Sequence, residues 1–342
     1  MEPLNRRLQI LSSIVDRYVS SGEPVGSKAV CEDLDFSFSS ATIRSEMAGL
    51  ASLGYLFQPH VSSGRIPSHQ GYRLYVNKLM EKKPLTLEEK SFLTGELNLS
   101  SAEPEKLLEA AAKALSEITS FTAIVTTPPS AQSCVRDITF VGIGRRTAML
   151  VLMTSDGIVK NKIFRCEYDL TSEVLHMFSG ILNGKFRGEK LKDITPEFIN
   201  ILVSKDRELA MLLLPVIDVL MEAARETCEV KIKVYGQKNL LSIPGITPST
   251  VINIFDFLED KNKVFDLLDT GSYGTKFTIG EENKYLQLQE ASVVSTHYSI
   301  GGKFGAVGVI GPTRMDYGKI YSQIEYVASL VGVLLGRILE NN

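Results

Sequence analysis

The stretch from residue 39 to residue 73, SSATIRSEMAGLASLGYLFQPHVSSGRIPSHQGYR, constrains the fold more than any other part of the 342-residue chain. Serine is a preferred helix N-cap, so the tandem Ser39 and Ser40 predict that a helix begins there. One stripe at helical spacing then carries the apolar residues Ile43, Met47, Leu50 and Leu53. The spacing predicts a helix that buries one face.

The opposite face of this predicted helix carries almost no long side chains. Its residues are Ala41, Ser45, Ala48, Gly49 and Ser52, with Thr42 and Arg44 flanking them near the N-terminal end. A solvent-facing surface normally carries long charged residues, whereas a bare one lets the backbone sink into a DNA major groove. First-turn side chains then reach base edges.

The flanking segments predict a winged helix-turn-helix over residues 1–83. Apolar spacing over residues 8–18 indicates one helix, and Ser27 can cap a second short helix that ends near residue 34. Residues 55–58 and 65–67 read as two short strands around a glycine-containing tip, and a further helix begins after Pro67. This order is typical of a module that reads duplex DNA.

Ten residues are the predicted DNA contacts. The groove contacts are Ser40, Thr42, Arg44 and Ser45, and the backbone or wing contacts are Ser27, Lys28, His60, Ser63, Gly64 and Arg65. Contact with another protein is the alternative, because many helix-turn-helix folds serve that purpose. Charge favours DNA only weakly, since residues 1–83 carry ten Lys and Arg against eight Asp and Glu.

Two long segments resemble the bacterial heat-inducible transcription repressor HrcA family. They are ATIRSEMAGLASLGYLFQPHVSSGRIPSHQGYRLYV and, at residues 307–328, VGVIGPTRMDYGKIYSQIEYVA. The similarity covers essentially the whole chain. Three positions depart from the family pattern: Ser45 stands where Asn is usual, and Ala51-Ser52 replaces a usually acidic pair. These departures affect the base contacts expected of the predicted recognition helix.

The resemblance implies a regulatory circuit, which no residue pattern in the sequence indicates by itself. Members of the family are expected to repress chaperone genes, of the groESL and dnaK type, as homodimers on an inverted-repeat operator called CIRCE. The chaperonin GroEL promotes the DNA-binding state. Unfolded proteins released by heat compete for GroEL, and repression is then relieved.

The rest of the chain predicts an α+β multidomain protein. Helices and strands over residues 84–129 and 229–342 follow an order similar to a GAF domain, with helices expected at 104–119, 249–268 and 315–339. Residues 130–228 look like an α/β domain inserted between two of its strands, with strands at 138–143, 147–153 and 158–166. Helices are expected there at 171–186, 196–203 and 207–226. The resemblance implies that this inserted domain dimerises the protein.

Dimerisation has its own argument, because a two-fold-symmetric operator needs two recognition helices about one helical turn, or a multiple of it, apart. The apolar helices at residues 175–182 and 209–220 are candidates for the interface or, equally, for the domain core. The heptad-like final helix is expected to pack in the core, since its repeat is too short for a coiled coil.

Other classes of function lack their signals. The glycines fit neither phosphate-loop nor dinucleotide spacing, and no catalytic triad or carboxylate pair is recognisable, so we expect no enzyme. Four scattered cysteines and four isolated histidines predict buried thiols and neither metal nor cofactor. No apolar run approaches the roughly 20 residues needed to span a bilayer, and the first residues lack the apolar core of a signal peptide, which predicts a cytoplasmic protein without a membrane partner. A small-molecule-responsive GAF-type regulator of other genes remains the alternative.

Overall fold

The chain folds into two compact units. The computed structural model describes residues 3–34, 37–60, 63–99, 103–128, 133–155, 157–196, 207–268, 274–300 and 303–340. These form a mixed α+β structure, with sheets of two, five and three strands in the described part. The first unit comprises Met1–Thr126, Ile232–Ile300 and Gly305–Leu335, and the second comprises Thr127–Lys231, Gly301–Phe304 and Gly336–Asn342.

The N-terminal segment, residues 3–78, combines helices with a short hairpin. Its elements are α1 (Pro3–Ser21), α2 (Ser27–Asp33), α3 (Ser40–Ser52), β1 (Leu56–Phe57), β2 (Ile66–Pro67) and α4 (His69–Lys78). The two strands pair antiparallel, with Leu56 opposite Pro67. Ile10, Ile14 and Leu50 are among the buried residues that hold the helices together.

The predicted start of α3 is confirmed. Ser39 is the N-cap, and its Oγ accepts the Thr42 amide at 3.1 Å. The stripe prediction holds for Ile43, Met47 and Leu50, whereas Leu53 is 54% exposed because it follows the end of the helix. The predicted cap at Ser27 is wrong, since α2 begins at that residue after Gly26 and has no side-chain cap.

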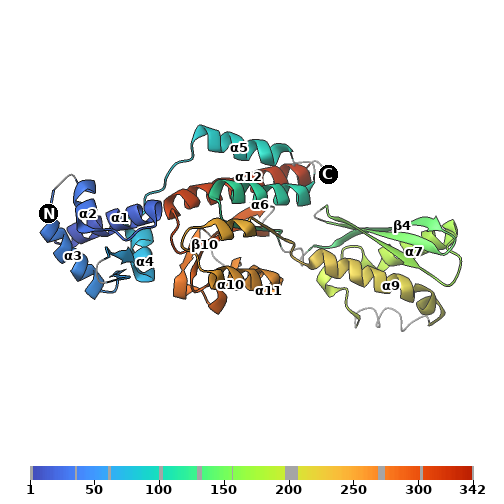
Figure 1. The fold of residues 1–342 in the computed structure, drawn as a ribbon. Coiled ribbons are helices and arrows are strands. Elements are labelled where there is room, and N and C mark those ends of the chain that lie inside the picture. The colour runs from blue at the N-terminus through green and yellow to red at the C-terminus, as the bar shows by residue number, and fades with distance from the viewer. Residues whose placement is uncertain are drawn as a thin grey trace. The chain divides into compact units, whose positions relative to one another are not determined.

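A five-stranded sheet forms the centre of the first unit. Its strands are β3 (Thr122–Thr126), β7 (Ile232–Tyr235), β8 (Lys276–Ile279), β9 (Ala291–Ile300) and β10 (Lys303–Pro312), in the order β7-β3-β10-β9-β8. Figure 1 shows α5 (Leu87–Leu99), α6 (Pro104–Thr119) and α12 (Tyr317–Glu340) on one side of it, with α10 (Pro248–Glu259) and α11 (Lys261–Leu268) on the other. The short 3₁₀ turns are η2 (Gln237–Ser242), η3 (Gly280–Glu282) and η4 (Leu286–Leu288).

Two details of this unit differ from the prediction. The helix expected over residues 249–268 is two helices, because Asp260 leaves the helical conformation and its carboxylate accepts the amides of Asn262 and Lys263 to start α11. Helix α5 was not predicted. It buries only Leu93 and Leu97, so its apolar spacing is weak. The last helix packs in the core as expected, through residues that include Ile324.

The second unit pairs a three-stranded antiparallel sheet with two long helices. Its elements are β4 (Val135–Gly144), β5 (Thr147–Thr154), β6 (Val159–Arg165), α7 (Ser172–Phe186), the 3₁₀ turn η1 (Leu191–Asp193) and α9 (Arg207–Cys228). The predicted strands and the helices at 171–186 and 207–226 are confirmed, and α9 continues through Pro215. The helix expected at 196–203 lies outside the described residues, apart from Pro196.

The two faces of the three-stranded sheet differ sharply. One face is buried against α7 and α9, and its residues include Ile138, Phe140, Leu150, Leu152 and Phe164. Apolar side chains of both helices, such as Phe178 and Leu220, are buried in the same core. The other face has no covering helix among the described residues. The apolar stripes of α7 and α9 are therefore mainly core.

The prediction of buried thiols holds for two of the four cysteines. Cys31 and Cys166 are buried as predicted, whereas Cys134 and Cys228 are partly exposed. Within the described ranges, no helix combines the length and the apolar character that crossing a membrane requires. Among the same residues, no cluster of three or more His, Cys, Asp or Glu is placed to hold a metal ion.

Candidate nucleic-acid interface

The outward face of α3 is exposed along its length. Arg44 and Ser45 are exposed, and Thr42 is half-buried at the N-terminal end. The hydroxyls of this turn are partly engaged: Ser40 Oγ lies 3.0 Å from Ser27 Oγ, and Thr42 Oγ1 lies 2.9 Å from Ser39 Oγ. The first pair joins the starts of α2 and α3. Two predicted DNA contacts, Ser27 and Ser40, are therefore hydrogen-bonded to each other.

The inward face of α3 is held by a buried carboxylate, Glu46. Arg7 donates Nε to its Oε2 at 2.7 Å, and Arg6 donates Nε to its Oε1 at 2.9 Å. The hydrogen bond from Arg7 is the main cause that lowers the pKa of Glu46, against burial, which acts to raise it; Arg6 lowers it further. Because both arginines belong to α1, this cluster clamps α3 onto α1 and leaves the opposite face of α3 free.

The hairpin is held close to the start of α2. Val25 and Arg65 exchange two backbone hydrogen bonds of 2.9 Å. A Cβ at Gly64 would lie 2.4 Å from the carbonyl carbon and oxygen of Val25, so only glycine fits there. Gly64 therefore has a packing role beside any role at a phosphate.

The polar residues of the hairpin tip brace one another. Ser63 Oγ donates to the His60 carbonyl at 2.7 Å and accepts the His60 amide at 3.0 Å. Arg65 donates to Gln58 Oε1, and Gln58 donates to the Ser63 carbonyl at 2.9 Å. His60 is exposed, whereas Ser63 and Arg65 are half-buried. The described residues of the tip are therefore linked to one another by their own side chains.

Two predicted contacts are cations without a partner of opposite charge. Lys28 on α2 and Arg44 on α3 are exposed, and neither forms an ion pair with any residue that the structure describes. Arg17, by contrast, is paired with Asp33 at 2.7 Å. A cation without an ion pair breaks no existing salt bridge when it binds a phosphate or a base edge.

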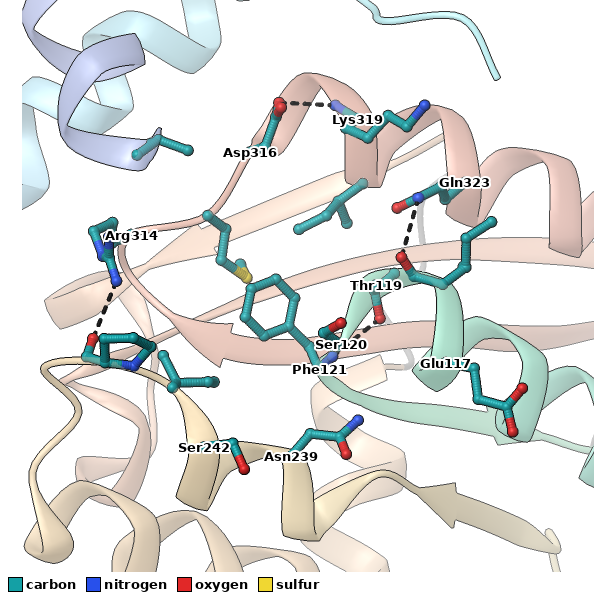
Figure 2. A pocket seen from close by; sticks show the side chains of 16 residues that line it. Glu117, Thr119, Ser120, Phe121, Asn239, Ser242, Arg314, Asp316, Lys319 and Gln323 are labelled. Carbon is teal, nitrogen blue, oxygen red and sulfur yellow. Dashed lines mark hydrogen bonds between the residues drawn. The ribbon is translucent and has the colours of Figure 1, made fainter. Parts of the chain in front are cut away.

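A second candidate site is a cavity of about 730 Å³ in the first unit. Figure 2 shows its wall built from the end of α6, the η2 turn and the loop that leads into α12. Arg314 donates to the Pro244 carbonyl at 3.0 Å. Lys319 pairs with Glu89 at 2.6 Å, and Asp316 pairs with Lys83 at 2.8 Å. Since these charges are already matched, the cavity does not point to one class of ligand.

The sequence matches one family of known proteins over most of its length. Residues 105–321 match the family model described as the HrcA protein C terminal domain. The chain is 33% identical over 339 residues to the heat-inducible transcription repressor HrcA of Desulfitobacterium hafniense, with 98% of each chain covered. A relative of the same name from Clostridium acetobutylicum is 33% identical, with 97% of each chain covered. The chain belongs to the heat-inducible transcription repressor HrcA family.

HrcA is a family of transcription repressors and not of enzymes, which confirms the prediction drawn from the sequence. A crystal structure described as that of a hypothetical protein has a TM-score of 0.69 and 24% identity, and covers 97% of this chain and 98% of its own. That likeness supports the fold as a whole.

Sequence reasoning did not find two residues that organise the interface. Glu46 lies between the exposed Ser45 and the buried Met47, and its arginine partners are 39 and 40 residues away. Gln58 was read as part of a strand, whereas it links Arg65 to the tip. A lone Glu beside the apolar stripe of α3 was the available signal for the first of these.

Replacing Glu46 tests the clamp. We expect Glu46→Gln to lower the free energy of unfolding near pH 7 by about 1–2 kcal/mol, discounted because both arginines are partly exposed. The folded-state pKa is lowered, so the wild-type contribution is present above the usual value of 4.5 and disappears as the pH falls through the folded-state pKa. Denaturant unfolding across a pH series measures the difference.

The matched control is Glu32→Gln, whose carboxylate is 60% exposed and lies 3.4 Å from Arg17. It should change the stability by much less. A Glu46→Gln effect that stays constant down to strongly acidic pH would contradict an ionised clamp.

Proposed function

We propose that the protein is a repressor that binds an inverted-repeat operator of the CIRCE type, upstream of chaperone genes, through a winged helix-turn-helix formed by residues 1–83. The observation that carries the proposal is the free face of α3. It is lined by short residues, bears the exposed Arg44, and is aligned from behind by Glu46. Membership of a transcription repressor family supports it.

In this proposal α3 enters the major groove and the hairpin contacts the backbone or minor groove. Arg44, Ser45, Thr42 and Ser40 are the groove contacts, and Ser27, Lys28, His60, Ser63, Gly64 and Arg65 are the backbone or wing contacts. Among the cations, Arg44 is suited to bidentate recognition of guanine and Lys28 to a phosphate. Ser45 gives a shorter reach than the Asn usual in the family.

We assign residues 84–129 and 229–342 to a GAF-like domain and residues 130–228 to an inserted dimerisation domain. The outer face of the three-stranded sheet is our candidate for the dimer interface. Its apolar residues are Val141, Met149, Val151, Met153, Val159 and Ile163. Val141, Met149 and Ile163 form one cross-strand row, and Val141 and Ile163 are 45% and 68% exposed.

A second copy of the chain is the occupant that fits this face. The inverted repeat calls for a two-fold axis, and a two-fold interface uses the same patch on both protomers. The apolar row is bordered on the same face by polar residues such as Thr139 and Asn161, which matches the apolar centre and polar rim of protein interfaces. The homodimer thus presents two recognition helices.

The chaperonin GroEL is the proposed partner that promotes DNA binding, so that heat relieves repression when unfolded proteins occupy it. The resemblance to the family supports this circuit. A repressor of chromosomal genes acts in the cytoplasm, and the proposed activity requires no cofactor. The cell would in this way match chaperone synthesis to the load of unfolded protein.

The decisive experiment is equilibrium binding to a labelled inverted-repeat duplex and to a scrambled duplex, across a salt series and with or without GroEL. We expect specific binding that GroEL strengthens. Equal binding to both duplexes by folded protein in the presence of GroEL would reject sequence-specific repression.

Arg44→Ala should weaken binding to the operator by about 1–3 kcal/mol and reduce the preference for it, because a base-edge contact is lost. Lys28→Ala is the matched comparison. It should weaken both duplexes alike and reduce the slope of log K against log salt by about 1, because one phosphate contact is lost. Titration of both variants measures the two effects, and equal losses on both duplexes for Arg44→Ala would remove its base-reading role.

Ile163→Asp should convert the dimer to a monomer, because it places a carboxylate in the exposed apolar row that Ile163 forms with Met149 and Val141. Light scattering after gel filtration measures the mass. Leu214→Asp is the control: Leu214 is 49% exposed on α9, on the helical side of the same unit. Dissociation by Leu214→Asp alone would transfer the interface to the helices.

The cavity of the first unit favours a second candidate function, a GAF-type regulator that responds to a small molecule and controls other genes. A volume of about 730 Å³ falls in the range of ligand pockets. Arg314 lines the cavity, whereas two tyrosines of the same unit do not: the Tyr298 hydroxyl donates to the Thr126 carbonyl, and the Tyr235 hydroxyl donates to Glu109. Thermal shift with a metabolite panel, followed by operator binding with any hit, distinguishes the two functions.

A further inference from the structure

The N-terminal segment is attached to the five-stranded sheet through α4. Arg73 donates Nε to Glu282 Oε1 at 2.7 Å and a terminal nitrogen to the Phe277 carbonyl at 2.7 Å. A second hydrogen bond reaches the other Glu282 oxygen. The planar guanidinium thus holds a carboxylate and a carbonyl in a fixed geometry, which a flexible point charge does not provide.

Close packing surrounds this contact. The rings of Tyr72 on α4 and Tyr317 on α12 are 5.8 Å apart. Gly280 has a φ of +57°, and a Cβ there would lie 2.3 Å from His69 Nδ1. Tyr72 is 1% exposed, and its hydroxyl has no hydrogen-bond partner among the described residues. The two surfaces fit without space for an added methyl group at Gly280.

Arg314 makes a second attachment at the end of α1. Its guanidinium carbon lies 5.9 Å from the centre of the Tyr18 ring, and it donates to the Pro244 carbonyl at 3.0 Å. Gly22 has a φ of +73°, and a Cβ there would lie 2.5 Å from an Arg314 nitrogen. The segment is therefore held at α1 and at α4, and two separate attachments resist rotation better than one.

We propose that Arg73 and Arg314 are positioning residues that hold the DNA-binding segment in one orientation on the five-stranded sheet, so that a dimer meets both operator half-sites at a fixed spacing. This inference rests on the proposed function. Neither residue is among the predicted DNA contacts. Their contribution appears only when both half-sites are bound, because a fixed orientation raises the effective concentration of the second recognition helix.

The experiment measures the affinity of the full-length dimer for one half-site and for inverted repeats whose half-sites are separated by different numbers of base pairs. The variants are Arg73→Met and Arg314→Met, which keep an apolar stem and remove the guanidinium. Tyr72→Phe is the matched control, since it keeps the ring on Tyr317 and removes only a hydroxyl without a partner.

We expect the wild type to bind one spacing best and the two Met variants to bind it at least about tenfold more weakly, with a flatter dependence on spacing. Half-site affinity should stay within about twofold, and Tyr72→Phe should behave as wild type. Retained half-site binding also shows that the variants are folded.

Three results with the Met variants would overturn the inference and leave the proposed function in place. The Met variants could keep the wild-type dependence on spacing, they could bind the operator more tightly, or both could lose half-site binding, which would place the two residues in the DNA-binding face itself. A wild type that prefers neither half-site nor operator over scrambled DNA would overturn the proposed function, and this inference with it.

Discussion

The arrangement of α1 and α3 in the N-terminal segment depends on the pairing of the buried Glu46 carboxylate with two arginines. A buried carboxylate must be paired, and two arginines from α1 meet that need at 2.7 and 2.9 Å. The consequence for α3 is directional: its one carboxylate points inward, and its outward face is left to short residues and the cation Arg44. Most amphipathic helices have the reverse arrangement, with charge facing solvent.

Local signals predicted most of the helices and strands, whereas contacts between residues far apart in the sequence could not be predicted from them. The serine cap of α3 acts within three residues, so it was visible in the sequence. The partners of Glu46 lie about forty residues away, and those of Arg73 more than two hundred. The break at Asp260 was missed because apolar spacing continues across it, although its carboxylate starts a new helix.

The candidate site shows the same division. Arg44 and Lys28 are charged and lie outside the buried apolar positions of their helices, so residue type and spacing predict that they are exposed. The linking of the hairpin tip by Gln58, Ser63 and Arg65 cannot be predicted in this way, because it depends on how a loop closes. In the second unit, the apolar run of β5 indicated a strand, yet only packing shows that Met149 and Val151 are on the side away from the helices.

The chain passes from the five-stranded sheet into residues 127–231 at the end of β3 and returns to the sheet at the start of β7, the strand beside β3. Strands β3 and β7 pair antiparallel, with Thr126 opposite Ile232, and the chain continues this ladder where the Thr127 amide donates to the Lys231 carbonyl at 2.9 Å. Antiparallel neighbours can be joined by a two-residue turn. Residues 127–231 therefore occupy the place of a hairpin loop between β3 and β7, so the pairing of these two strands requires no more than a short turn and does not depend on how the segment between them folds.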